Sequence, residues 1–188
     1  MKVELGLIGL LVSLAVAPAH AQQKLVSEKS EIRFVAKQMN VPTEGRFRKF
    51  SADILFDPAK PETAKAQIEV DLGSIDMGSE EGETEVKRKP WFNVEFFPKA
   101  SFTGAVAKPL GGGRFEMPGK LGIKGISRDV MLAFALRQEG GNLIAEGSYP
   151  LKRLDFKIGE GAWADTDTVA NEVQVRFRVV LSGAPAKR

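Results

Sequence analysis

The residues closest in type and spacing to a reactive site lie in the segment LDFKIGEGAWADTD, residues 154–167. Glu160, Asp165 and Asp167 are carboxylates of the kind that act as general acid and base, for example in a hydrolase of a lipid or a glycan. The glycines of this segment predict a mobile, wet loop, in which carboxylates keep their ordinary acidity. The spacing Asp165-x-Asp167 also lacks the further ligands of a calcium loop. We therefore expect no metal site, and a hydrolase using the 160–167 loop is the alternative function.

The same segment can instead form the rim of an apolar interior. In this interpretation Phe156 and Ile158 end a strand inside the protein, and Gly159 and Gly161 turn the chain. Trp163 then folds back over the interior as an amphipathic plug. This interpretation needs no chemistry from the carboxylates, so we prefer it.

The types of residue that are missing narrow the chemistry further. The chain has no cysteine, and its single histidine lies at position 20. Residues 2–21 open with a lysine, continue through an apolar run and end in Ala-His-Ala, as a secretory signal peptide does. Cleavage after Ala21 would leave residues 22–188 as one domain without imidazole or thiol, which excludes Ser-His-Asp and Cys-His catalysis, His/Cys zinc sites and disulfides. We expect export to the periplasm, no cofactor and no catalytic residue.

The charge of the chain argues against a nucleic-acid partner. Lys and Arg number 27 and Asp and Glu number 24, for a net charge of +3. The basic residues are spread along the chain and form no stripe interleaved with aromatics. A transient contact with an anionic membrane surface or a membrane partner fits this modest surplus, and the sequence leaves a homodimer open.

The elements that must position these residues are mostly strands. Apolar and polar residues alternate from Ala64 to Asp71 and again over 173–181, which predicts strands with one buried face. Glycine- and proline-rich turns recur about every dozen residues, a spacing typical of an antiparallel sandwich or barrel. The polar segment 79–89 carries Glu and Lys at i,i+4 spacing and is stopped by Pro90, which predicts a short surface helix. The segment VMLAFAL, residues 130–136, is apolar on both faces and predicts a strand between an interior and a covering element.

Six segments, read in order, resemble the YceI-like family of periplasmic, lipocalin-like lipid-binding proteins. They are GRFRKF (45–50), ILFDP (54–58), DLGSID (71–76), KPWFNVEFFPKASF (89–102), GKLGIKGISRDVML (119–132) and KRLDFKIGEGAWADTD (152–167). The resemblance implies an all-β fold, an extended eight-stranded antiparallel lipocalin-like barrel closed at one end, with a short surface helix. It also implies a non-catalytic binding or carrier function for a polyisoprenoid, an isoprenoid quinone or a fatty-acyl-like chain held inside the barrel.

A barrel of about eight strands can be filled by side chains or can hold one slim ligand. Many phenylalanines, interrupted by small residues such as Ala66 and Gly104, favour a lined tunnel, whereas an ordinary filled core is the alternative. The candidate lining residues, with both tryptophans as lids, are Phe34, Phe47, Ile54, Phe56, Ile68, Val70, Trp91, Phe102, Leu121, Ile123, Met131, Phe134, Phe156, Trp163, Val175 and Phe177.

Charged residues near the interior have two interpretations each. Arg153 and Asp155 would point to one side of a strand, where they form a structural ion pair or a solvated face. Alternatively, Arg153 lies near a ligand headgroup. We name Arg153 as the headgroup candidate. Lys124 and Arg128 are expected to be surface charges.

Overall fold

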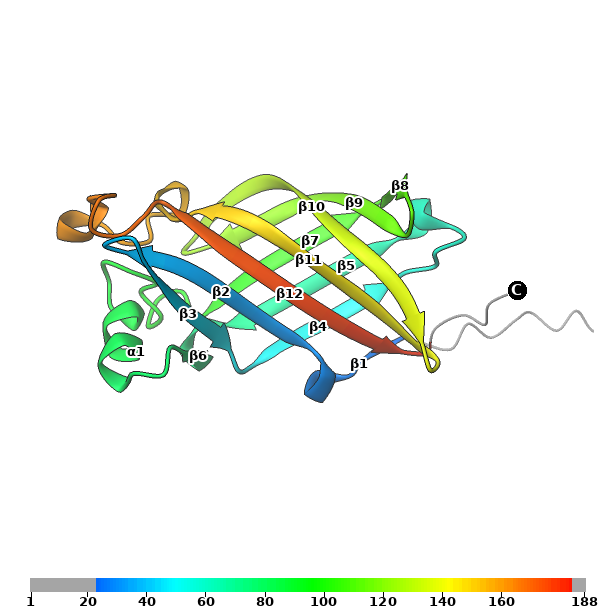
Figure 1. Ribbon diagram of the computed structural model, residues 1–188, viewed down its shortest axis with the longest axis horizontal. Coiled ribbons are helices and arrows are strands. Elements are labelled where there is room, and N and C mark those ends of the chain that lie inside the picture. The colour runs from blue at the N-terminus through cyan, green and yellow to red at the C-terminus, as the bar shows by residue number, and fades with distance from the viewer. Residues whose placement is uncertain (1–22, 184–188) are drawn as a thin grey trace, which may run out of the picture.

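The computed structural model describes residues 23–183, and these fold into one elongated β-barrel with a single α-helix at one end (Figure 1). The strands are β1 Lys24–Leu25, β2 Glu31–Gln38, β3 Val41–Phe47, β4 Phe50–Leu55, β5 Lys65–Asp71, β6 Ile75–Asp76, β7 Lys99–Ala105, β8 Lys108–Gly111, β9 Arg114–Ile123, β10 Ile126–Glu139, β11 Asn142–Lys152 and β12 Glu172–Ser182. The helices are α1 Glu80–Lys87 and the 3-10 turns η1 Ser27–Lys29, η2 Pro61–Thr63, η3 Leu72–Ser74, η4 Arg153–Phe156 and η5 Gly161–Ala164. No helix within residues 23–183 is long and apolar enough to cross a bilayer.

All strand pairs are antiparallel, and the sheet closes on itself. The order is β4-β5-β7-β9-β10-β11-β12-β2-β3-β6, with β1 added on β12 and β8 added on β9. β1 and β2 both pair with β12, β3 and β4 follow each other within two residues, and β5 and β6 pair with β4 and β3. β1 with β2, β3 with β4, and β5 with β6 can each be counted as one interrupted strand. Together with β7, β9, β10, β11 and β12 they make a barrel wall of eight strands. The antiparallel lipocalin-like barrel expected from the sequence is therefore confirmed.

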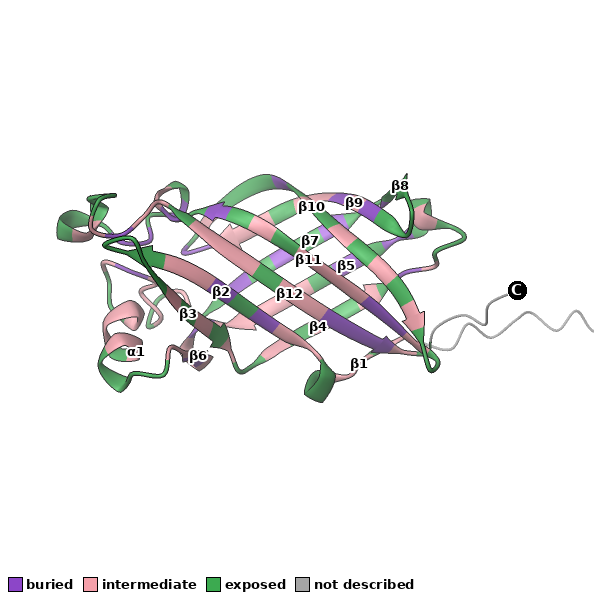
Figure 2. Ribbon diagram, in the orientation of Figure 1, coloured by how far each residue is buried: buried purple, intermediate pink, exposed green. Residues whose placement is uncertain are grey.

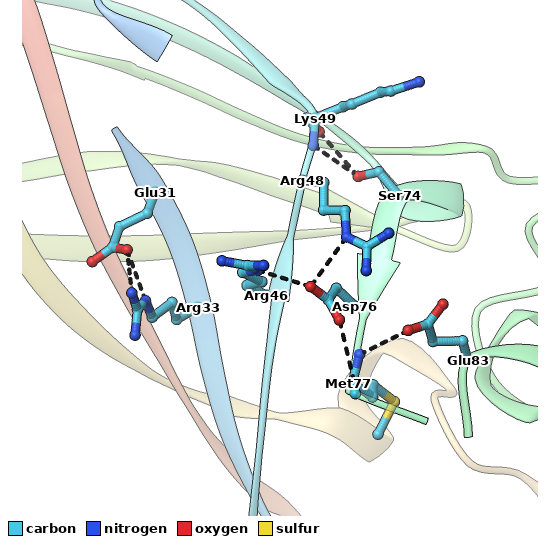
Figure 3. Close-up of polar contacts among 10 residues, drawn as sticks. Glu31, Arg33, Arg46, Arg48, Lys49, Ser74, Asp76, Met77 and Glu83 are labelled. Carbon is cyan, nitrogen blue, oxygen red and sulfur yellow. Dashed lines mark hydrogen bonds and ion pairs between the residues drawn. The ribbon is translucent and has the colours of Figure 1, made fainter. Parts of the chain in front are cut away.

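Polar contacts hold the two places where the barrel closes through short strands. On the β3–β6 side, Asp76 accepts hydrogen bonds from Arg46 Nε at 2.9 Å and Arg48 Nε at 3.1 Å (Figure 3). Between β1 and β4, the side-chain amide of Gln23 donates to the carbonyl of Phe56 and accepts from its N–H, both at 2.8 Å. The Asp76 contacts reinforce the short β3–β6 ladder, and the Gln23 contacts satisfy the backbone N–H and C=O of Phe56.

Sequence-local signals place most of these elements correctly. β5 and β12 match the alternating segments, and α1 lies inside the predicted polar helix, with Ser79 as its N-cap. The β9–β10 hairpin turns at Lys124-Gly125 and the β10–β11 hairpin at Gly140-Gly141, all with positive φ, as the two-residue turns of twisted hairpins require. The β2–β3 turn uses Met39 and Asn40 at positive φ, which no glycine in the sequence indicated.

The buried residues form two clusters at opposite ends of the barrel. One cluster, toward the end that carries the β10–β11 turn, includes Phe56 and Phe115, whose ring centroids lie 5.2 Å apart. Phe134 packs on both rings at 5.8 Å, so three phenylalanines fill this end. The other cluster includes Trp91 and lies at the α1 end. In Figure 2 the fully buried stretch of β12 lies toward its C-terminal end, and the rest of the strand is less buried.

Candidate ligand-binding site

The barrel encloses a cavity of about 630 Å³ whose lining side chains are almost all apolar. This volume falls in the range of about 300–1,000 Å³ typical of small-molecule sites. The cavity contacts residues of both buried clusters, from Phe56 and Leu181 at one end to Trp91 and Trp163 at the other. It is therefore a lengthwise bore.

Burial along the strands independently shows that the middle of the barrel is hollow. Inward-facing residues of a filled core would be almost completely buried. Here Phe134, Leu136, Val175 and Phe177 line the interior and yet are only half-buried. Their remaining accessible surface faces the cavity, so the tunnel expected from the sequence is present and the filled core is not.

Most of the predicted lining residues lie on the cavity. These are Phe34, Phe47, Ile54, Phe56, Ile68, Val70, Trp91, Phe102, Leu121, Ile123, Phe134, Trp163, Val175 and Phe177. Arg153 also borders the cavity. Met131 and Phe156 do not.

Met131 and Phe134 were both predicted to line the cavity, although residues three apart on a strand point to opposite faces. The prediction for Met131 is the wrong one. Val130, Leu132, Phe134 and Leu136 point inward, whereas Met131 is 45% exposed on the outer face. The alternation is hidden in the sequence because outward positions also carry apolar residues. Within residues 23–183 no element covers the outer face of β10 as expected, since its outward positions among residues 127–139 are exposed.

Phe156 is buried, with 2% of its surface exposed, but it packs in the α1-end cluster instead of lining the bore. The expected strand through Phe156 and Ile158 is replaced by η4. Ile158 does line the cavity. Lys157 follows in the left-handed conformation at φ 53°, which ends η4 and turns the chain toward the rim.

Arg153 is 1% exposed and forms no pair with Asp155, which contradicts the expected ion pair. Its guanidinium donates to backbone carbonyls only. Nε contacts Ala170; Nη1 contacts Ile158 at 2.9 Å and Gly159 at 3.1 Å; and Nη2 contacts Asp165 at 3.5 Å and Val169 at 2.6 Å. A guanidinium has five N–H donors, and these contacts occupy all of them. Arg153 therefore has no donor left for a headgroup, and burial lowers its pKa.

Lys124 is buried, contrary to the expected surface position. Its ammonium donates to the carbonyls of Lys89 at 3.0 Å and Lys157 at 2.6 Å, and to the Glu160 carboxylate at 2.8 Å. The hydrogen bond from Lys124 holds the pKa of Glu160 below its usual value. The β9–β10 turn thus ties together the two loops at the α1 end.

The cavity opens between α1 and η5. Glu81 and Glu85 of α1 and Trp163 of η5 line the cavity and also a shallow hollow on the outside. The rings of Trp163 and Trp91 lie 5.3 Å apart at this end, which fits their expected position as lids. The buried indole N–H of Trp91 has no hydrogen-bond partner among the described residues.

The contribution of α1 to the cavity wall was not predicted from the sequence. Gly82 and Val86 line the bore together with the two glutamates. A polar helix carries no local signal that it closes an apolar cavity. Leu132, Leu136 and Tyr149 were also missed, although consistent alternation along β10 would have found the two leucines.

Fold and cavity together define a lipocalin-like β-barrel protein with an open apolar interior. A YceI-like domain matches residues 24–181, and the chain belongs to the YceI-like family. A UPF0312 protein of Azotobacter vinelandii is 32% identical over 120 residues, which is 61% of this chain and 62% of that protein. A UPF0312 protein of Photorhabdus laumondii is 28% identical over 125 residues, 62% of this chain and 65% of its own. The matched segments therefore span less than two thirds of these two relatives.

Solved structures share the fold. Burkholderia cenocepacia BcnA is 41% identical, with a TM-score of 0.82, and the match covers 84% of this chain and 99% of that one. A polyisoprenoid binding domain from Saccharophagus degradans, implicated in plant cell wall breakdown, is 20% identical with a TM-score of 0.67, covering 88% and 100%. At that identity the second likeness concerns the fold alone.

Proposed function

We propose that this protein binds one long apolar lipid chain inside the barrel and carries or sequesters it without changing it chemically. The chain belongs to a polyisoprenoid, an isoprenoid quinone or a fatty-acyl-like lipid. The observation that supports this proposal is the lengthwise apolar bore, which is open between α1 and η5. The Saccharophagus degradans domain, which has the same fold, is a polyisoprenoid binding domain, and this points to the same ligand class.

The energetics of burial are sufficient for such a ligand. An 11-residue strand such as β12, tilted as barrel strands are, gives a bore on the order of 25–30 Å long. Each buried methylene contributes about 0.8 kcal/mol. A chain of about twenty carbons therefore offsets the several kcal/mol that immobilisation costs. Selection by such a bore depends on the length and girth of the chain.

The carboxylates of the 160–167 loop favour binding over hydrolysis. A general acid needs a pKa raised toward neutrality. The pKa of Glu160 is instead lowered by Lys124, and that of Asp165 is lowered by the N–H of Asp167 and the hydroxyl of Thr168. Both groups are ionised at neutral pH and serve to hold the loop.

Tryptophan fluorescence tests binding directly, because both tryptophans of the chain line the cavity. Titration with a long-chain alcohol should shift the emission of the wild type and saturate at one ligand per protein. Ala145→Phe places a ring in the bore and should abolish the shift, because the ring occupies the volume that the chain would fill. Ala133→Phe, exposed on the outer face of β10, is the matched control and should titrate like the wild type.

An Ala145→Phe protein that melts like the wild type and still binds would contradict the proposal. So would a wild type that shows no saturable shift with any apolar chain.

The proposed place of action is the periplasm, on the pattern of residues 2–21, which lie outside the described residues. Recovery of a chain starting at residue 22 from the periplasmic fraction is the expected result. An uncleaved chain in the cytoplasm would contradict it.

A further inference from the structure

Phe34 lies over a glycine on the neighbouring strand. Phe34 of β2 pairs with Gly45 of β3. A Cβ atom added to Gly45 would lie 2.3 Å from Phe34 Cζ and under 3 Å from both Cε atoms. The tip of the ring therefore occupies the place of the missing side chain, against the barrel wall.

The same arrangement recurs at two further places. Gly104 of β7 pairs with Gly119 of β9, and the tip of the Phe102 ring lies over both, at 2.7 Å and 2.4 Å from their added Cβ atoms. Phe177 of β12 lies in the same way over its partner Gly147 of β11, at 2.5 Å. All three rings border the cavity.

The backbone φ angle does not require glycine at these positions. None of the four glycines has a positive φ, unlike the turn glycines of this chain. At Gly45 an alanine could adopt the same backbone conformation, but the Phe34 ring would have to leave the wall. At Gly119 and Gly147 the added Cβ would also lie 2.7 Å and 2.5 Å from the backbone oxygens of Thr103 and Ala133. At Gly45, the most direct reason for glycine is therefore the space that it gives to the Phe34 ring.

We propose that these ring-on-glycine pairs set the girth of the bore, so that it admits methyl-branched, isoprenoid-type chains as well as unbranched ones. The inference rests on the proposed lipid-binding function. With a side chain at the glycine position, the ring turns toward the axis of the bore and narrows it. A methyl-branched chain is wider than an unbranched one and is the first to be excluded.

Gly45→Ala is the sharpest test, because the three nearest atoms to its added Cβ all belong to the Phe34 ring. Gly122→Ala is the matched control. Gly122 also lies in a strand, but its added Cβ meets only Ser101 atoms, and no ring covers it. The probes are geranylgeraniol, which carries a methyl branch on every isoprene unit, and hexadecanol, the unbranched alcohol of the same backbone length. Tryptophan fluorescence measures both affinities.

The expected result is that Gly45→Ala weakens geranylgeraniol binding roughly tenfold or more, as overpacking of a filled site does, while hexadecanol loses no more than about threefold. Gly122→Ala should leave both affinities unchanged. Equal losses for the two alcohols, or no loss for either, would overturn the inference.

A second pair of variants separates a local ring effect from general destabilisation. In a Phe34→Ala background the ring is gone, so adding Gly45→Ala should no longer change the ratio of the two affinities. A persistent change in that ratio would show that alanine acts by another route. If the wild type binds neither alcohol, the proposed function fails; if it binds both and the ratio is insensitive to Gly45, only the girth inference fails.

Discussion

Arg153 is the residue on which the loop at the cavity opening depends. Its buried guanidinium gathers carbonyls from positions 158, 159, 165, 169 and 170, and its charge is offset by these dipoles and by the face of Trp91, 5.9 Å away. The carbonyls of Ile158, Gly159 and Val169 belong to buried residues, where an acceptor without a donor is costly. Arg153 therefore positions the rim, including Trp163, without contacting a headgroup.

Arg153→Met should lower the free energy of unfolding by about 3 kcal/mol or more, because it leaves several buried carbonyls unpaired. Urea denaturation followed by circular dichroism measures the change. Arg176→Met, at an exposed arginine on β12, is the matched control and should change stability by less than about 0.5 kcal/mol. Equal stability of the two variants would show that the carbonyls find other donors.

At the scale of elements, β6 joins the barrel to α1. This two-residue strand pairs with β3, and Asp76 links Arg46 and Arg48 while accepting the N–H of Gly78 at 3.2 Å (Figure 3). The side chain of Glu83 in α1 accepts the N–H of Met77 next to it. The position of the helix over the bore thus depends on this short closure.

The lowered pKa of Asp76 predicts how the β3–β6 contacts respond to acid. Hydrogen bonds from Arg48 and Arg46 lower its pKa from 3.8 to about 2. Because the folded pKa lies below the unfolded one, this contribution to stability is present above about pH 4 and is lost as the pH falls through about 2. The Tm of the wild type should therefore fall over this pH interval by more than the Tm of Asp76→Asn. The variant should already have a lower Tm than the wild type at pH 7.

Asp53→Asn, at an exposed carboxylate on β4, is the control and should keep the acid response of the wild type. An Asp76→Asn protein with an unchanged acid response would show that the β3–β6 contacts do not contribute to stability.

At the scale of the molecule, strand alternation and turn residues predicted an antiparallel sandwich or barrel, and the order of motifs, through the resemblance to the YceI-like family, indicated the barrel. Lining residues on clearly alternating strands, such as Ile68 and Val175, followed from parity alone. Met131 did not, because β10 is apolar on both faces and only the pairing with β9 and β11 sets which face is inward. The role of Arg153 was hidden because its partners are backbone carbonyls, which leave no pattern in the sequence.

The part of α1 in the cavity was unpredictable for a related reason. A helix rich in glutamate looks like a solvated surface element, and only the tertiary fold places Gly82 and Val86 over the bore. The opening, its acidic rim and the ring-on-glycine pairs are likewise products of contacts between distant segments. Local sequence thus predicted the strands of the barrel wall better than it predicted the residues that line and close the cavity.

Native mass spectrometry of the protein purified without detergent tests the central claim most directly, since it weighs the chain together with whatever fills the bore. We predict one apolar compound per wild-type chain, recovered in organic extract, and none on Ala145→Phe. A wild type that stays at its bare mass even after incubation with isoprenoid, quinone and fatty-acyl lipids, or an Ala145→Phe protein that carries the same compound, would contradict the account.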